Sequence, residues 1–104
     1  MADVDKVMWQ LDEAMYAAGF GVDSMSLGDE VVRTYRTEGT SLTVDASRSD
    51  PDEWRVRLHL PGRMYAVADE TMDLDGQPAH VVAQVVLATM TRMLVGASRR
   101  ECDA

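Results

Sequence analysis

The sequence predicts an α+β domain in which an antiparallel β-meander of about four strands is flanked by an N-terminal helix and a longer C-terminal helix. Apolar residues recur at helical spacing near the start of the chain, and apolar and polar residues alternate through its middle. A long apolar segment without a breaker lies near its end. The resulting order, α-β-β-β-β-α, is typical of a two-layer sandwich with both helices on one face of the sheet.

The first helix is predicted from Val4 to Ala18. Its apolar residues are spaced three or four apart, so they line one face of a helix. Asp3 is placed to cap its start and Gly19 to end it. Residues 19–29, "GFGVDSMSLGD", then form a turn-rich connection.

Strands are expected at 30–37, 40–47 and 54–60, with the dipeptide "EG" as a hairpin turn between the first two. The segment "RSDPD" is predicted to be a polar loop. Residues 64–69 are a weaker candidate for the fourth strand, because alanine is a poor strand former. The clearest of these strands is 54–60, in which apolar residues alternate with arginine and histidine.

The register of the central hairpin follows from its apolar residues. Folding the chain about "RSDPD" places Leu42, Val44 and Ala46 opposite Leu58, Val56 and Trp54, so one face is apolar throughout. On the other face, Asp45 then lies opposite Arg55, Thr43 opposite Arg57 and Ser41 opposite His59. We interpret Arg55 as a structural residue paired with Asp45.

Arg57 and His59 have no acid across from them in this register. They are either part of a solvated outer sheet face or an anion-binding site. The strand at 30–37 adds Arg33 with Tyr35 or Arg36 with Thr34 to the same face, and the turn length does not choose between them.

The final helix is predicted from 79 to 98, with Pro78 in its first turn. Because valine is a poor helix former, a strand over 81–87 is the alternative. The most apolar stretch, 81–95, is interrupted by polar residues, and we expect it not to span a bilayer. Its apolar surface is wide, and only a narrow strip through His80, Gln84 and Thr91 is polar. The excess predicts a homodimer through this helix.

Length and composition indicate a single globular domain over residues 1–104, because compact domains commonly have about this size. The formal charge of −8 disfavours nucleic acids and anionic membranes and favours a partner with a basic surface. Cys102 is the only cysteine, and no signal peptide is recognised, so a cytoplasmic location is expected.

The sequence does not predict a calcium site, a zinc site or a catalytic motif. Asp73, Asp75 and Gly76 have the spacing of a calcium loop, but Thr71 and Val82 occupy its first and last ligand positions. Two histidines and a terminal cysteine do not have the spacing of a zinc site. No nucleophile elbow or phosphate loop is present, so we expect neither catalysis nor a cofactor, although a small enzyme remains an alternative.

The first helix contains the candidate binding site. Trp9 and Tyr16 lie seven residues apart, off the centre of the apolar stripe, and Asp5, Asp12 and Glu13 surround them. An aromatic pair among acids is typical of a hot spot for a basic or arginine-bearing partner. The alternative is that both rings pack sideways against the final helix.

The function predicted is that of a small, acidic, non-catalytic interaction domain that binds another protein. Inhibitor, immunity-type, adaptor and chaperone-like proteins belong to this class. The alternative is an anion- or nucleic-acid-binding module that uses the Arg57 and His59 face.

Overall fold

The computed structural model describes the backbone of residues 2–102 and the side chains of residues 2–99. It contains helix α1 (Val4–Ala17), strands β1 (Gly21–Leu27), β2 (Glu30–Thr37), β3 (Thr40–Ser47), β4 (Asp50–His59) and β5 (Ala68–Asp73), and helix α2 (Ala79–Cys102). The side chain of Cys102, on which the cytoplasmic prediction partly rests, lies outside the described residues.

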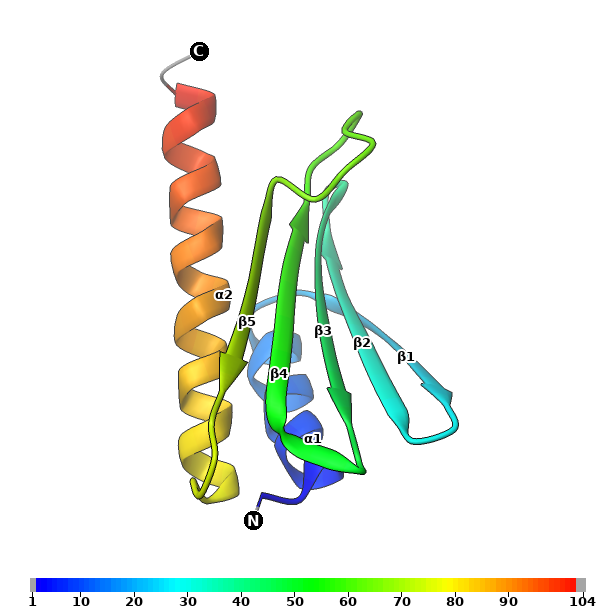
Figure 1. Ribbon diagram of the computed structural model, residues 1–104. Helices are drawn as coiled ribbons and strands as arrows, with labels where there is room; N and C mark the ends of the chain where they lie inside the picture. Colours follow the sequence, from blue (N-terminus) through cyan, green and yellow to red (C-terminus); the bar gives the residue numbers. More distant parts are fainter. Residues whose placement is uncertain (1, 103–104) are drawn as a thin grey trace.

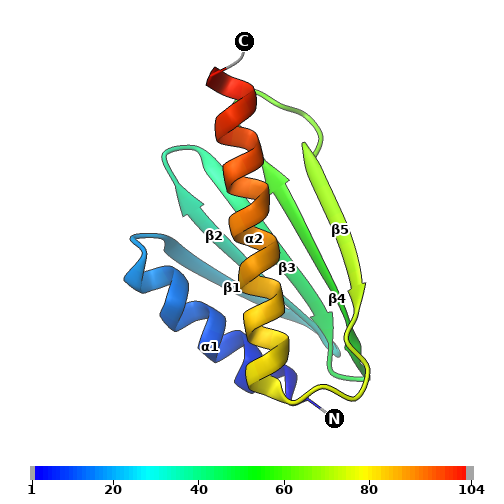
Figure 2. The same ribbon diagram turned by 90° about the vertical axis from the view of Figure 1, so that its left-hand side faces the viewer.

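The five strands form one antiparallel sheet in the order β1-β2-β3-β4-β5 (Figure 1). Both helices lie on the same face of this sheet, with α1 beside α2 in the view of Figure 2. The predicted α+β meander with an N-terminal and a C-terminal helix is therefore confirmed, with one strand more than expected.

The additional strand is β1, whose residues the sequence analysis assigned to a turn-rich connection. The glycine and serines of this segment do not favour a strand by propensity. Backbone hydrogen bonds to β2 hold it in the extended conformation instead. The fourth predicted strand is also corrected, since β5 covers Ala68–Asp73 rather than 64–69. β4 begins at Asp50, so three of the five residues of the predicted loop "RSDPD" belong to it.

Local signals determine both ends of α1. The carboxylate of Asp3 accepts hydrogen bonds from the amides of Asp5 and Lys6. At the other end, the amide of Phe20 donates to the carbonyl of Met15 at 3.0 Å, and Gly19 adopts a φ of +94°. These are the bonds of a Schellman cap, and they turn the chain directly into β1.

The predicted register between β3 and β4 is confirmed residue for residue over 41–46 and 54–59. The "EG" turn is also confirmed, because Glu38 and Gly39 both have positive φ, as a two-residue hairpin turn requires. The turn at Asp75 and Gly76, set aside as a calcium loop, connects β5 to α2.

The core lies between the sheet and the two helices. The central strands contribute Val31, Tyr35, Leu42, Val44, Trp54, Val56 and Leu58, and the helices contribute Val4, Val7, Met8, Leu11, Met15, Val82, Val86 and Met90. The indole Nε1 of the buried Trp54 donates to the carbonyl of Pro51 at 2.9 Å, so this large ring has no unmet polar group.

The helix α2 extends four residues beyond its predicted end at Ser98. Its segment Ala79–Arg99 is long and apolar enough to cross a membrane by length and composition alone, with a mean hydropathy of 1.5. A helix packed on the core of a soluble domain passes the same test, and 39% of this segment is buried here. Its residues Val82, Val86 and Met90 are buried in the core.

Candidate partner-binding site

The aromatic pair of α1 is exposed. Trp9 keeps 59% of its surface in solvent and Tyr16 keeps 77%, so neither ring is buried against α2. They project from the side of α1 that faces away from its buried stripe of Val7, Met8 and Leu11. The rings are therefore accessible to a partner, which was the condition for the predicted hot spot.

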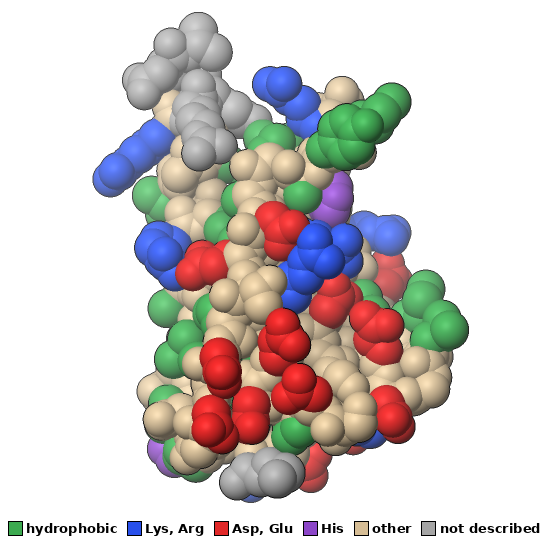
Figure 3. All heavy atoms as spheres, viewed as in Figure 1, with side chains coloured by type: hydrophobic (Ala, Val, Ile, Leu, Met, Phe, Trp, Pro, Cys, Tyr) green, Lys and Arg blue, Asp and Glu red, His purple; other side chains and the backbone are tan. Residues whose placement is uncertain are grey.

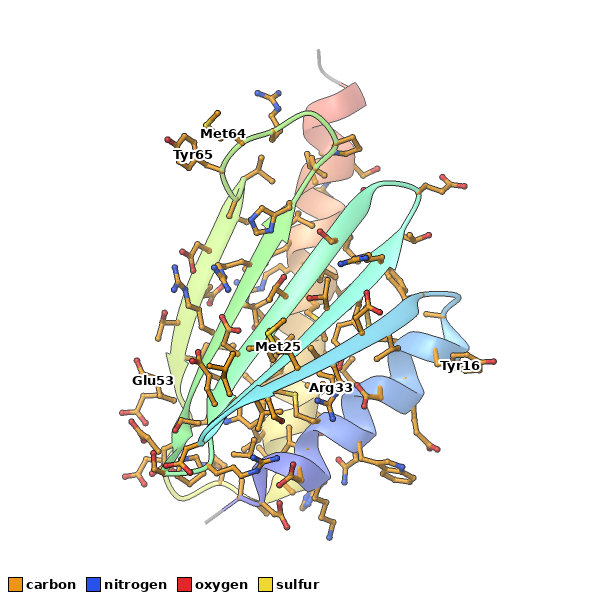
Figure 4. The ribbon with its side chains drawn as sticks, turned by 90° about the vertical axis from the view of Figure 1, so that its right-hand side faces the viewer. Tyr16, Met25, Arg33, Glu53, Met64 and Tyr65 are labelled. Carbon is orange, nitrogen blue, oxygen red and sulfur yellow. The ribbon has the colours of Figure 1, made fainter. Side chains whose placement is uncertain are left out.

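Around these rings lies an open depression of about 510 Å³, lined by Trp9, Asp12, Glu13, Tyr16 and Val22. We call it the aromatic depression. Four of its residues are spaced by three or four along α1, and the fifth comes from β1. The depression therefore lies where the helix meets the edge strand, and Figure 4 shows Tyr16 projecting outward from α1.

The carboxylate of Asp12 connects α1 to β2. Its Oδ1 accepts a 2.8 Å hydrogen bond from the hydroxyl of Tyr35, and its Oδ2 lies 3.1 Å from Nε of Arg33. Burial of the Tyr35 ring and its hydrogen bond to Asp12 raise the pKa of the phenol well above its usual value. Asp12 is thus a structural anchor as well as a wall of the depression.

The other two predicted acids have different surroundings. Asp5 forms two 2.9 Å hydrogen bonds with Arg48, which hold the pKa of the Asp5 carboxyl below its usual range, and it does not line the aromatic depression. Glu13 is exposed and lines the depression. The predicted rim of Asp5, Asp12 and Glu13 is therefore reduced, within the described residues, to Glu13 and the partly neutralised Asp12.

The basic row of β4 lies on the face of the sheet that the helices leave open. Arg55 does not pair with Asp45, the residue across from it, but with Asp69 on β5, at 2.9 and 2.6 Å. Arg57 pairs instead with Asp45, at 2.7 Å. Both ion pairs are diagonal, so the expected partner of Arg55 was wrong although its register was right.

Arg57 also has an acid directly across from it on the other side, Asp69 of β5. Its side chain is 31% exposed and that of Asp45 only 14%, whereas both members of the Arg55–Asp69 pair are more than 40% exposed. Hydrogen bonds from Arg55 lower the pKa of Asp69. The predicted anion site at Arg57 and His59 thus has its guanidinium occupied, and His59 is half-buried beside it.

The structure decides which residues of β2 share this open face. Thr34 lies across from Thr43, so Thr34 and Arg36 are on the side of Arg57. Arg33 and Tyr35 are on the helix side, where they meet Asp12.

Acidic side chains gather at the end of the sheet where β4 begins and β5 ends (Figure 3). Asp50, Asp52, Asp73 and Asp75 line a shallow hollow there, and partial desolvation together with the carboxylate of Asp75 raises the pKa of Asp52. In the part of the chain that the structure describes, no three histidine, cysteine or acidic residues are arranged to hold a metal ion.

Two exposed apolar residues that lie outside the aromatic depression are not predicted from the sequence. Met25 is 59% exposed and Leu27 70%, and both lie on the open face of β1. The period-two alternation of Asp23, Met25 and Leu27 with Val22 and serines is present in the sequence. This alternation does not predict a strand, because the apolar residues of β1 lie mostly on the solvent side and not on the core side.

Comparisons with protein-family models, with curated proteins and with solved structures found no match. What the site binds must therefore be inferred from its own geometry.

Proposed function

We propose that this protein is a small acidic interaction domain that binds another protein through the aromatic depression. The observation that carries the proposal is the exposure of two large aromatic side chains, Trp9 and Tyr16, which lie about two turns apart on the same side of one helix. Tryptophan and tyrosine are the residues most enriched in binding hot spots, because they bury a large area at a small cost in entropy.

The chemistry of the depression favours a basic side chain of the partner. An arginine or lysine placed over the ring of Trp9 or Tyr16 gains a cation–π interaction, and the exposed carboxylate of Glu13 lies beside it. The formal charge of −8 attracts basic partners over a longer range. An inhibitor, immunity-type, adaptor or chaperone-like protein would act in this way, and the single cysteine agrees with a cytoplasmic location.

The experiment is selection of a random peptide display library on the immobilised protein, followed by affinity measurements on the enriched peptides. We expect arginine- and lysine-rich peptides whose affinity collapses in Trp9→Ala and Tyr16→Ala. Both variants should keep the wild-type Tm, because the rings are mostly in solvent. Tyr65→Ala is the matched control, since Tyr65 is 78% exposed but lies on the loop between β4 and β5 (Figure 4).

The proposal fails if the enriched peptides bind Trp9→Ala and Tyr16→Ala as tightly as the wild type. It also fails if both variants unfold readily, because the rings would then belong to the core.

The second candidate function is anion binding by Arg57 and His59. It is favoured by one observation, that Nε of Arg57 is buried and has no hydrogen-bond partner among the described residues. An anion could accept this hydrogen bond only if the guanidinium turned toward solvent, and it would then compete with Asp45 for the same group. A phosphate titration followed by the NMR signals of His59, with Arg57→Gln as the control, separates this function from the first.

A further inference from the structure

We infer that the partner segment is an extended strand that adds to the free edge of β1, with basic side chains toward α1 and apolar side chains toward the open face of the sheet. This inference rests on the proposed function and specifies how the partner docks. The sheet has two edge strands, β1 and β5, and these differ in their charged residues.

The β5 edge carries three acids, Asp69, Glu70 and Asp73, and charged residues on an edge strand discourage pairing with another chain. The β1 edge has only Asp23, whose charge is balanced by Arg36 at 3.1 Å. All of β1 except Val22 is exposed, and the strand contains no proline. Its outer row of backbone groups is thus free of the usual protection.

Both faces of β1 offer apolar contacts to an added strand. On the open face, Met25 and Leu27 are exposed two residues apart, and Figure 4 shows Met25 on β1 well away from the loop of Met64 and Tyr65. On the helix face, Val22 is part of the aromatic depression. Because the side chains of a strand alternate between faces, one extended segment reaches both surfaces at once.

The charges favour a basic segment over a second copy of this chain. A side chain of the added strand that points toward α1 beside Val22 enters the depression near Glu13. Two β1 strands paired about a two-fold axis would instead bring two Asp23 residues and two acidic α1 helices together. The partner sequence is therefore one that alternates basic and apolar residues.

The test uses a seven-residue peptide of alternating arginine and valine, matched to the seven residues of β1. Two further peptides carry N-methyl groups, one on every arginine and the other on every valine. An added strand directs only every second amide toward its neighbour, so one methylated peptide should bind like the parent and the other should lose affinity by about tenfold or more. A peptide of the same composition in two blocks should bind weakly.

Variants of the protein complete the test. Met25→Lys and Leu27→Lys should weaken binding, because each replaces an apolar contact with the added strand on the open face by a charge on the edge strand. Thr71→Lys, an equal change on the opposite edge, should not weaken it. Hydrogen exchange of alternate β1 amides should slow in the complex.

The two levels of the proposal fail differently. If Trp9→Ala abolishes peptide binding but both methylated peptides bind alike, the strand-addition inference is overturned and the proposed function stands. If Trp9→Ala and Tyr16→Ala have no effect on binding, the proposed function is overturned instead. A homodimer in solution that Met25→Lys dissociates would show that a second copy occupies the edge, which also overturns the inference.

Discussion

The hydroxyl of Tyr35 donates a 2.8 Å hydrogen bond to Oδ1 of Asp12, and this bond joins α1 to β2. The side chain of Tyr35 is fully buried, while Asp12 lines the aromatic depression on the other side. Asp12 therefore fixes α1, the helix that carries Trp9 and Tyr16, against β2.

This anchor predicts how stability depends on alkaline pH. The pKa of Tyr35 is raised in the folded protein above its ordinary value of 10.0, first by burial and then by Asp12. The unfolded chain loses this proton at a lower pH than the folded protein, so the stabilisation is complete below about pH 10 and is lost as the pH rises beyond it. Denaturant unfolding from pH 8 to 11 should show this decline, and Tyr35→Phe should flatten it. Tyr65→Phe should leave the profile unchanged, and an equal flattening there would contradict the assignment.

Removal of the same hydroxyl at neutral pH should cost about 1.5–3 kcal/mol in the free energy of unfolding, the value of a hydrogen bond to a charged group. Asp12→Ala should cost more, because it leaves both Tyr35 and Arg33 without their acceptor. Equal losses in the two variants would show that Arg33 contributes nothing through Asp12.

The two ion pairs on the open face should differ in value. Arg57→Ala should destabilise the protein by about 1–3 kcal/mol, because it leaves the mostly buried carboxylate of Asp45 unpaired. Arg55→Ala should have a small effect, since Arg55 and Asp69 are both exposed. This order reverses the one expected from the register alone. A double-mutant cycle between Asp45 and Arg57, measured by urea unfolding, checks it, and a coupling near zero would contradict it.

Gly39 should tolerate no side chain. Its φ is +83°, and an added Cβ would lie 2.8 Å from Cγ of Pro61. Gly39→Ala should therefore cost about 1–2 kcal/mol for the left-handed backbone and more for the contact. Gly28→Ala is the control, because its φ is +61° but no atom lies within 4 Å. If the two variants lose the same stability, Pro61 yields without cost.

A homodimer through α2 is the remaining prediction. The outward strip of this helix passes through Gln84, Ala88, Thr91 and Val95, which are exposed and uncharged. Acidic side chains gather near the start of α2 (Figure 3), and the sequence places Arg92 and Arg99 toward its end. An antiparallel pair of helices would therefore bring opposite charges together. Light scattering after gel filtration should give twice the chain mass.

Ala88→Glu should convert this dimer to a monomer, while Ala17→Glu, the same change at an exposed position of α1, should not. A wild-type monomer at all concentrations would contradict the prediction.

The features that the sequence predicted correctly depend on neighbouring residues. The caps of α1 at Asp3 and Gly19 and the turn at Glu38 and Gly39 are set by the conformations those residues prefer. The register of β3 with β4 belongs to the same group, because a one-residue slip would bring every apolar side chain of the shifted strand to the solvent face.

The features that only the tertiary structure decided depend on residues far apart in the chain. β1 is a strand because β2 pairs with it, although its own sequence does not bury an apolar face. Asp12 was expected to be a free acid of the rim, but Arg33 and Tyr35, 21 and 23 residues away, occupy its carboxylate. Arg55 and Arg57 each form an ion pair with a diagonal acid and not with the acid directly across from them. A long arginine side chain can reach several carboxylates on a pleated sheet, and only the packing of all five strands determines which of them lies at hydrogen-bonding distance.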